Sequence, residues 1–407
     1  MPVIDSRRQS SMNAKPLNEA LPMSPKVTFV VPCYKLAHLL PGCVDSILSQ
    51  TYRDFEILIM DDCSPDNTPE VAQSFNDPRV RHIRNEPNLG HLRNYNKGIQ
   101  MARGQYVWLI SADDRLRTPY ILERYATAME ANPKIGYAFC PAIELKNGCE
   151  TRLLQYSCHG DQDAIFDGRE FVAKLLNGNF VIAASGMARK ECYEKAGYFP
   201  LNMPYAGDWY IWLIFALHFD VAYFAEPMVN YRAHELAMTS QYMEQGHEVF
   251  KVDGLTVLWR MKQEIEKEKH AALARKCAER IADRYRYYVT SHIWKTSPHQ
   301  MSLEEYEESV DRHAITEGEA TWVRARVNTG IGDSYSAHRQ FDQALPFYKR
   351  ALKQDFWVPG TWAKYALLSL RLGDVGLRIR EGLTGLKRMM TGAAKSDALA
   401  QTKPAGN

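Results

Sequence analysis

The sequence has no large excess of charge of one sign. Its 50 Lys and Arg residues face 48 Asp and Glu residues, so the 407-residue chain carries a net charge of only +2. Proteins that bind nucleic acid through counterion release need a strong basic excess, so we expect no nucleic-acid partner. The 45% hydrophobic content excludes a disordered or fibrous chain. A chain of this length predicts two or three domains, each with its own core.

Paired cysteines, a secretory signal and a membrane-spanning run are also missing. The eight cysteines form no CxxC pair and no zinc-ligand spacing, which favours reduced and mostly buried thiols. The most apolar stretch, Ile211 to Val229, is broken by His218, Asp220 and Glu226 and is too polar to span a bilayer. The first 25 residues lack the apolar core of a signal peptide. These absences predict a cytoplasmic protein with at most a peripheral membrane contact.

Short apolar runs alternate with longer amphipathic stretches in the first third of the chain. The periodicity predicts strands at residues 27–32, 55–62, 80–84, 105–110 and 135–139, and helices at 37–50, 69–75, 89–103 and 119–131. This alternation predicts an α/β fold with a Rossmann-like, mostly parallel sheet and helices on both faces. Ligands of such sheets bind at the carboxyl ends of the strands, so polar residues there are candidates for a site.

Beyond Glu244 the strand-like runs end, and apolar residues recur at helical spacing, which predicts an all-helical C-terminal domain. Small and aromatic positions in this region match one tetratricopeptide-like helical hairpin, which would need a neighbour to cover its apolar face. They are Gly332, Tyr335, Phe341, Ala344, Tyr348 and Ala351. From Trp362 to Met390, basic residues alternate with Leu, Ile and Trp. That pattern fits either an interfacial helix on anionic lipid or a packed helix with a solvated basic face.

Acidic pairs follow two of the expected strands. Asp61 and Asp62 come after the second strand, and Asp113 and Asp114 come after the fourth. The first strand ends in Pro32-Cys33-Tyr34 and is followed by neither GxGxxG nor GxxxxGK[ST], which disfavours a dehydrogenase or a P-loop nucleotide hydrolase. Carboxylates are the ligands that hard divalent cations prefer. The strand ends therefore favour a metal-assisted site.

Four blocks of sequence, in order, resemble a family 2 glycosyltransferase of the GT-A fold. They are the run from VTFVVPCYK to DDCSPDNT (27–68), the run from NEPNLG to ISADD (85–114), GDWYIWLIFALHF (207–219) and YRAH (231–234). The resemblance covers about residues 26–240. It implies inverting transfer of a sugar from a nucleotide-diphosphate donor (UDP, GDP or dTDP), with Mn²⁺ or Mg²⁺, to a glycan or glycolipid acceptor.

The resemblance also implies a role for each matching residue. Asp208 is the expected catalytic base, and Asp114 and His234 are the expected metal ligands. The residues expected to contact the nucleotide sugar are Pro32, Tyr34, Asp62, Arg93, Asp113 and Arg232, with Asp62 on the base and Asp113 on the ribose. Two positions depart from many relatives, because Ser111 and Gly207 stand where an acid is common. Ordinary alternatives stay open: turn or helix-cap aspartates, and a surface arginine or histidine.

The sequence therefore predicts four segments: a disordered tail at 1–25, a GT-A domain at 26–240, a helical domain at 241–395 and a disordered tail at 396–407. The predicted function is inverting sugar transfer in bacterial surface polysaccharide or glycolipid assembly, in the cytoplasm or on the inner face of the membrane through the C-terminal basic helices. The alternatives are an inactive GT-A-like scaffold protein and a GT-A-like nucleotidyltransferase. A nucleotidyltransferase would need a glycine-rich basic loop after the first strand, and the sequence there is a poor match.

Overall fold

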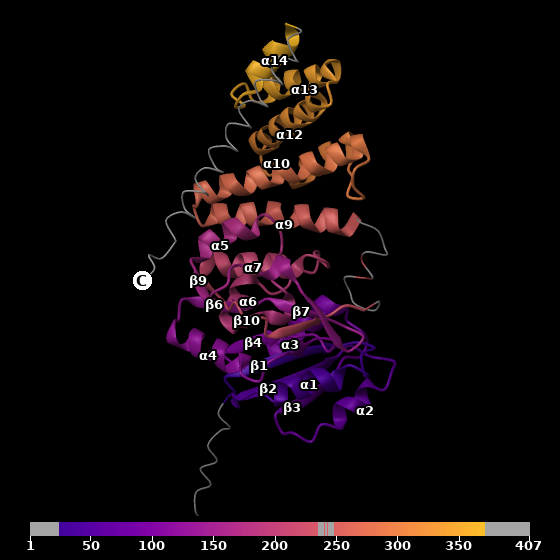
Figure 1. Cartoon of the computed structure of the whole chain (residues 1–407), viewed down its shortest axis with the longest axis vertical. Helices are drawn as coiled ribbons and strands as arrows, with labels where there is room; N and C mark the ends of the chain where they lie inside the picture. Colours follow the sequence, from indigo (N-terminus) through magenta and orange to yellow (C-terminus); the bar gives the residue numbers. More distant parts are fainter. Residues whose placement is uncertain (1–23, 235–239, 241, 243–247, 371–407) are drawn as a thin grey trace, which may run out of the picture.

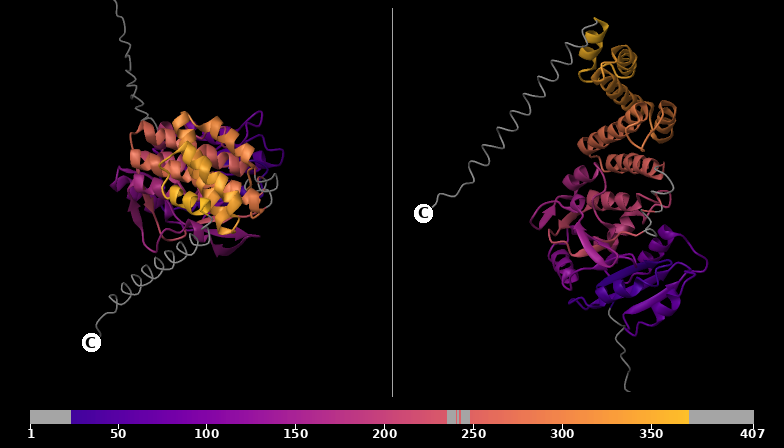
Figure 2. Two further views of the ribbon diagram at one scale, coloured as in Figure 1. Left: turned by 90° about the horizontal axis from the view of Figure 1, so that it is seen from above. Right: turned by 45° about the vertical axis from the view of Figure 1, so that its right-hand side comes forward.

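The computed structural model describes residues 24–234, 240, 242 and 248–370 (Figure 1). Except for residues 24 and 25, the two predicted tails lie outside these ranges. The described part is elongated: strands occupy one end, and helices are stacked in layers toward the other end (Figures 1 and 2).

An eight-stranded sheet forms the centre of the first part of the chain, in the order β3-β2-β1-β4-β10-β6-β11-β9. Its strands are β1 (Val27–Cys33), β2 (Phe55–Asp61), β3 (Val80–Arg84), β4 (Tyr106–Leu109), β6 (Ile135–Phe139), β9 (Ala164–Phe166), β10 (Met187–Arg189) and β11 (Asp220–Tyr223). β1 to β4 are parallel, as are β6 and β11, whereas β10 runs antiparallel between β4 and β6. The mostly parallel α/β sheet is thus confirmed. The three-residue strands β9 and β10 were missed because so short a run has no readable period.

A second, four-stranded sheet was not predicted. Its order is β5-β12-β7-β8, formed by β5 (Arg115–Leu116), β7 (Ala142–Lys146), β8 (Cys149–Leu153) and β12 (Val229–Arg232). β12 pairs antiparallel with β5, with Asn230 opposite Arg115. This pairing joins two segments that are more than a hundred positions apart, and it brings the chain after Tyr231 next to Asp113 and Asp114.

Helices cover both faces of the large sheet, as the sequence predicts. They are α1 (Leu40–Leu48), α2 (Thr68–Gln73), α3 (His91–Met101), α4 (Ile121–Ala131), α5 (Gly168–Leu175), α6 (Lys190–Ala196) and α7 (Gly207–His218). One core contains Phe29 and Val31 with residues of α1 and α4, and the other contains Val30 and Met60 with residues of α3, α5 and α7. Because successive residues of β1 point to opposite faces, one strand supplies both cores. Gly98 lets α3 pack directly on Val30 and Met60, since a Cβ there would collide with both.

The chain after residue 247 is helical throughout its described part. It forms α9 (Glu248–Lys267), α10 (Ala271–Trp294), α11 (Leu303–His313), α12 (Glu317–Ala337), α13 (Phe341–Gln354) and α14 (Thr361–Ser369). α9 lies on α7, α10 lies on α9, and α12 to α14 continue the stack (Figures 1 and 2). The predicted hairpin is α12 with α13: a Cβ at Gly332 would lie 2.7 Å from the Tyr348 ring, and Tyr335 stacks on Phe347 with ring centroids 5.6 Å apart. Its neighbours in the stack are α10 and α14.

The cysteine and membrane predictions can be compared with the structure directly. All eight cysteines are free thiols, and five of them are buried, as expected. The apolar stretch from Ile211 to Val229 is divided among α7, β11 and the start of β12. α7 itself is buried almost all round between the sheet and α9. None of the described helices combines the length and apolarity that crossing a bilayer requires. Of the predicted basic helix from Trp362 to Met390, the part after Leu370 lies outside the described residues.

Candidate active site

The ends of β1, β2 and β4 meet at one edge of the large sheet. The backbone N–H of Asp62 donates to the Cys33 carbonyl at 2.9 Å, and the N–H of Ala112 donates to the Pro32 carbonyl at 3.1 Å. The buried end of β1 contains Pro32, one of the residues predicted to contact the nucleotide sugar. It is therefore hydrogen-bonded to both segments that carry the acidic pairs. Parallel pairing makes this convergence necessary, because parallel strands end at the same edge.

Asp62 is buried and binds the segment that leads into α3. Its Oδ1 accepts hydrogen bonds from Asn85 Nδ2 at 2.9 Å and from the Leu89 N–H at 2.8 Å, and its Oδ2 accepts one from the Gly90 N–H at 2.9 Å. Asn85 also donates to the buried Asn94 in α3 at 2.8 Å. Asp62 thus fixes the start of α3, and Oδ2 keeps capacity for a further donor. Its role on a nucleobase stays a prediction.

Asp61, the other acid of this pair, has a different environment. Its Oδ2 accepts a charge-assisted hydrogen bond from Arg84 Nη1 at 2.6 Å, and its Oδ1 accepts the Ser64 N–H at 2.8 Å. The carboxylate is fully buried and paired with the neighbouring strand β3. Asp61 therefore holds the turn after β2 in place, and only Asp62 connects to α3.

Tyr34 and Arg93 lie on the accessible side of this edge. Tyr34 is exposed directly after β1, and Lys35 Nζ lies 5.0 Å from the centre of its ring. Lys35 has a left-handed backbone conformation, and its N–H donates to Ser64 Oγ at 3.2 Å. Arg93 is exposed on α3 and makes no ion pair with any described residue. Both side chains are thus accessible to a ligand, and their predicted contacts with the nucleotide sugar stay predictions.

Asp113, Asp114, Arg232 and His234 are brought together by the pairing of β5 with β12. His234 Nε2 lies 2.9 Å from Asp113 Oδ2, and Arg232 Nε donates to the Asp113 carbonyl at 2.7 Å. The backbone N–H of Arg232 donates to Asp114 Oδ1 at 2.8 Å. Four residues predicted for the site therefore form one cluster. The sequence alone places them in separate blocks.

The electrostatics of this cluster favour a positive charge nearby. Burial raises the pKa of Asp113, but the hydrogen bond and charge of His234 outweigh it and leave that pKa below its ordinary value. Burial and then the charge of Asp113 raise the pKa of Asp114 well above its ordinary value. Asp113 Oδ1 is buried without a hydrogen-bond partner. Unpaired buried carboxylate oxygen is costly, and a bound cation would relieve that cost.

The cluster is not a preformed metal site in the part of the chain that the structure describes, where no three His, Cys, Asp or Glu side chains are arranged to hold an ion. His234 contacts Asp113 through the same nitrogen that it would offer to a metal. The donor set, two carboxylates and an imidazole, nevertheless suits Mn²⁺ or Mg²⁺ in chemical type. The partnerless oxygen of Asp113 adds a further potential ligand to the predicted Asp114 and His234.

Asp208 lies in the first turn of α7. Its Oδ2 accepts a hydrogen bond from Asn179 Nδ2 at 2.9 Å, and its Oδ1 accepts the Trp209 N–H at 2.7 Å. Burial raises the pKa of Asp208 to about 6, although these two hydrogen bonds act in the opposite direction. A carboxylate with such a pKa is mainly ionised at pH 7 and is a stronger base than an ordinary aspartate.

The charges of three acidic residues act on Tyr95 of α3. Burial raises the pKa of Tyr95 above its ordinary value, and the charges of Asp113, Asp208 and Asp114 raise it further, so all three carboxylates act electrostatically on this one side chain. His91, whose ring centre is 5.6 Å from that of Tyr95, hydrogen-bonds through Nε2 to the Pro204 carbonyl at 3.0 Å. α3 therefore connects the strand ends to the segment that precedes α7. We did not predict a role for Tyr95, since its spacing is that of any aromatic residue on a packed helix.

Two further tyrosines lie near Asp208. Burial and then the charge of Asp208 raise the pKa of Tyr156 above its ordinary value, and the same two causes raise the pKa of Tyr205 to about 12. The Tyr156 side chain is largely exposed, whereas Tyr205 packs on Phe250 of α9 with ring centroids 4.0 Å apart. Neither residue was predicted, because Tyr156 lies in a single-turn 3-10 helix (Gln155–Ser157) and Tyr205 lies in a loop, and neither segment has a readable period.

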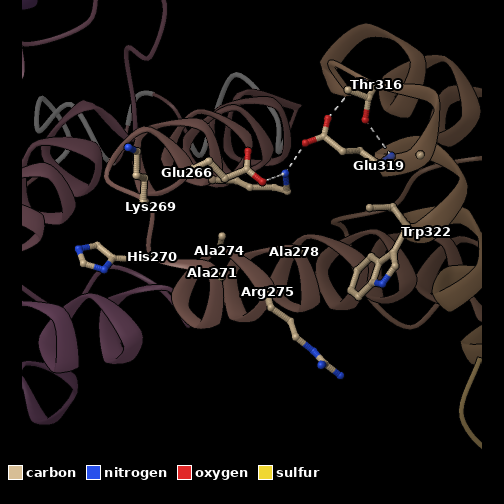
Figure 3. Close-up of a pocket in the computed structure, with 13 residues that line it drawn as sticks. Glu266, Lys269, His270, Ala271, Ala274, Arg275, Ala278, Thr316, Glu319 and Trp322 are labelled. Atoms are coloured by element: carbon tan, nitrogen blue, oxygen red, sulfur yellow. Dashed lines mark hydrogen bonds and ion pairs between the residues drawn. The ribbon is translucent and has the colours of Figure 1, made fainter.

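A separate cavity of about 710 Å³ lies among α9, α10 and the start of α12 (Figure 3). Ala271, Ala274 and Ala278 form a wall of small side chains, and Trp322 stands at one end (Figure 3). Lys262 in its lining is paired with Glu266 at 2.6 Å and with Glu319. Lys262, Glu266 and Glu319 in this cavity are thus paired with one another, and the predicted catalytic residues all lie elsewhere.

The fold and a match to a sequence family define the class of the first part of the chain. The eight-stranded sheet with acids at the ends of β2 and β4 has the layout of the GT-A fold. The sequence model of the family described as glycosyl transferase family 2 matches residues 28–197. Those residues therefore form a domain of glycosyltransferase family 2. Asp208, Arg232 and His234 lie beyond the matched range.

Individual relatives agree with this assignment at low identity. The chain is 24% identical over 225 residues to an uncharacterized glycosyltransferase of Rickettsia typhi. The matched region covers 55% of this chain and 69% of the relative. It is 28% identical over 161 residues to the GalNAc(5)-diNAcBac-PP-undecaprenol beta-1,3-glucosyltransferase of Campylobacter jejuni. That match covers 38% of this chain and 50% of the relative. The crystal structure of S. aureus TarS 1-349 with UDP-GlcNAc superimposes with a TM-score of 0.54 at 16% identity, covering 81% of this chain and 91% of that one. This last likeness shows the fold alone.

Proposed function

We propose that this protein is an inverting, metal-dependent glycosyltransferase that moves a sugar from a nucleotide-diphosphate donor to a hydroxyl group of a glycan or glycolipid. The observation that carries the proposal is that the charges of Asp113, Asp114 and Asp208, from separate parts of the sequence, all act on Tyr95. Inverting transfer needs one carboxylate at the acceptor and a second acidic centre at the departing diphosphate. The alternative of an inactive scaffold offers no reason for bringing the charges of three acids to bear on one side chain.

Asp208 is the proposed general base. It accepts the proton of the acceptor hydroxyl while the acceptor oxygen bonds to the anomeric carbon and the bond from that carbon to the diphosphate oxygen breaks on the opposite face. The proton ends on Asp208, and the electron pair leaves with the nucleoside diphosphate. Asn179 and the Trp209 N–H orient the carboxylate through the hydrogen bonds described above. The raised pKa, about 6, suits this proton transfer near neutral pH.

Asp114 and His234 are the proposed metal ligands, and Asp113, proposed to face the ribose, lies beside them. A divalent cation held there would neutralise the negative charge that develops on the leaving diphosphate. Arg232 keeps the two acids in place, because its side chain binds the Asp113 carbonyl and its N–H binds the Asp114 carboxylate. Those two bonds hold the acidic turn after β4 against β12.

The donor is proposed to lie over the ends of β1 and β2, on the backbone of Pro32 with its base near Tyr34 and Asp62 and its phosphates near Arg93. The exposed Tyr34 ring offers a flat apolar face for a base. A uridine nucleotide is the first donor to test, because the similarly folded TarS has been crystallised with UDP and with UDP-GlcNAc. The acceptor is proposed to approach Asp208 past Tyr156 and Tyr205, whose rings suit the apolar faces of a sugar.

We further propose that the product belongs to a surface polysaccharide or glycolipid and that transfer takes place in the cytoplasm. The Campylobacter jejuni relative supports this proposal, because its name describes a glucosyltransferase acting on an undecaprenol-linked glycan. The boundary at residue 240 between a catalytic and a helical domain also stays a proposal. It is supported by the change from mixed α/β structure to helices alone.

Ligand-dependent thermal stability tests the proposed function. We expect the melting temperature to rise with one matching nucleotide among UDP, GDP and dTDP sugars, and to rise further with Mn²⁺ than with a chelator, since ligands that bind the folded state stabilise it. Asp114→Ala should abolish the metal-dependent part. No stabilisation by any donor in the presence of Mn²⁺ would favour the scaffold alternative.

A further inference from the structure

Two hydrogen bonds in series connect a lysine of α3 to the carboxylate of Asp62. Lys97 Nζ donates to Asn85 Oδ1 at 2.7 Å, and Asn85 Nδ2 donates to Asp62 Oδ1 at 2.9 Å. Asn85, which directly follows β3, and Asp62 are both buried, whereas Lys97 is partly buried. We call Lys97, Asn85 and Asp62 the Asp62 network. Lys97 and Asn85 have so far been given no part in the proposed reaction.

The donors and acceptors of the Asp62 network allow only one orientation of the Asn85 amide. A lysine ammonium only donates and an ionised carboxylate only accepts, so the amide oxygen faces Lys97 and the amide nitrogen faces Asp62. Asn85 Nδ2 also donates to the buried Asn94 Oδ1 at 2.8 Å, and Asn94 Nδ2 donates to the Met60 carbonyl at 2.9 Å. A flipped amide would place its oxygen against two acceptors. Lys97 therefore determines which way the amide donates.

The fixed amide also determines which acceptor position Asp62 keeps for a ligand. Oδ1 accepts from Asn85 and from the Leu89 N–H at 2.8 Å, which uses both of its positions, and Oδ2 accepts from the Gly90 N–H at 2.9 Å. One position on Oδ2 is left. A base with a ring N–H, such as uracil or guanine, can donate to it. Cytosine or adenine in the same pose would place a ring nitrogen lone pair against the carboxylate, so a site of this kind should reject them.

We propose that Lys97 and Asn85 are positioning residues that set the base preference of the donor site, because they fix the direction of the Asp62 carboxylate. This inference rests on the proposed function, in which Asp62 faces the nucleobase. Both residues act through Asp62, and neither needs to touch the nucleotide. In the buried interior the charge of Lys97 polarises the amide and strengthens its hydrogen bond to Asp62. A merely structural role predicts a weaker fold with an unchanged base preference, whereas a positioning role predicts a changed preference.

Calorimetric titration of the full-length protein with nucleoside diphosphates and Mn²⁺ tests this role. The base preference is the affinity for UDP relative to CDP, or for GDP relative to ADP if the guanine nucleotide binds better. Lys97→Met keeps the length of the side chain but loses the donor, so the preference should fall about tenfold, the equivalent of one hydrogen bond. Asn85→Asp replaces the donor with an acceptor that faces Asp62, and the preference should fall further. Lys97→Arg keeps N–H donors and should retain most of the preference.

The matched control is Asn96→Ala, which removes another amide of α3. The two hydrogen bonds of Asn96, both 2.9 Å, join the backbone of Phe199 and not Asp62. This variant should melt at a lower temperature and keep the base preference of the wild type.

Thermal melting of every variant separates loss of folding from loss of preference, and Lys97→Met decides the question if Asn85→Asp does not fold. The inference is overturned if folded Lys97→Met keeps the wild-type preference, if Asn96→Ala loses it equally, or if the wild type binds both bases alike. The wild type still binds nucleotide in each of these results, so the proposed sugar transfer would stand. A wild type that bound none of the nucleotides would overturn both proposals.

Discussion

Single aspartates in this protein differ mainly in what surrounds their oxygens. Asp62 accepts three hydrogen bonds from the segment before α3, and Asp61 is paired with Arg84. Asp208 accepts two hydrogen bonds, yet burial still raises its pKa to about 6. An aspartate therefore stabilises the local structure through hydrogen bonds at one position and is a candidate base at another.

Replacing Asp208 with asparagine tests the proposed base. The amide is nearly the same size, and its one oxygen can still accept one of the two hydrogen bonds from Asn179 and Trp209, but it cannot take a proton from the acceptor. We expect the transfer rate to fall about 100-fold or more, while the affinity for the donor stays close to that of the wild type. Steady-state kinetics and nucleotide titration measure the two effects. Turnover at a comparable rate would show that another group removes the proton.

The pH dependence of transfer follows from the pKa of Asp208. Only the ionised carboxylate can act as a base, so kcat/KM should be level above about pH 6 and fall at lower pH. The slope should approach tenfold per pH unit, as expected for one ionisation. Donor binding measured over the same range provides the control. An inflection near pH 4, the ordinary aspartate value, would contradict the proposed environment of this residue.

At the scale of elements, the helical extension takes part in shaping the candidate site. Asp253 of α9 is buried, and its Oδ2 accepts the backbone N–H groups of Tyr205 at 2.7 Å and of Ala206 at 3.0 Å. Those residues immediately precede α7, whose first turn contains Asp208. The guanidinium of Arg260, also on α9, lies 4.7 Å from the centre of the Tyr210 ring. α9 therefore fixes where α7 begins.

Asp253→Ala should weaken both the fold and the reaction. Losing the acceptor of two buried N–H groups is expected to cost about 1–3 kcal/mol of unfolding free energy. Asp208 should also lose its position, so kcat should fall. Denaturant unfolding and kinetics measure these effects. Asp253→Asn is the matched control, since its amide oxygen can accept both bonds; equal damage by both substitutions would argue against this hydrogen-bonding role.

The whole molecule is a stack in which each layer covers the apolar face of the one before it. α7 is apolar nearly all round, because the sheet lies on one side of it and α9 on the other. Trp209 and Tyr210 belong to the same buried core as Trp259 and Tyr285 of the helical region. One continuous core therefore crosses the proposed boundary at residue 240.

A truncation after residue 240 tests this continuity. Removing α9 would expose the outer face of α7, including Trp209, and an apolar surface of that size promotes aggregation. We expect the truncated chain to be insoluble or to lack a cooperative thermal transition, as judged by gel filtration and calorimetry. A chain ending at Leu370 keeps every described layer and should fold normally. A soluble, cooperatively folding 1–240 fragment would establish an independent catalytic domain instead.

The sequence by itself determined the elements whose signal is local. β1, β2, β4 and the helices between them follow from periodicity, and the α12–α13 hairpin follows from the spacing of small and aromatic residues. The two acidic pairs could be placed at strand ends because parallel strands end at one edge. The roles of those acids, and of Asp208 and His234, stay predictions, since a side chain's function depends on neighbours that the local sequence does not reveal.

The tertiary structure alone decided which distant segments meet. The antiparallel insertion of β10 between β4 and β6, and the pairing of β5 with β12, join strands of two to four residues from far apart in the chain. Such short runs have no preferred state of their own and become strands only when a partner is present. The same holds for Tyr95 and Asp253. The importance of Tyr95 comes from the acids whose charges act on it, and that of Asp253 comes from the two backbone N–H groups that donate to it.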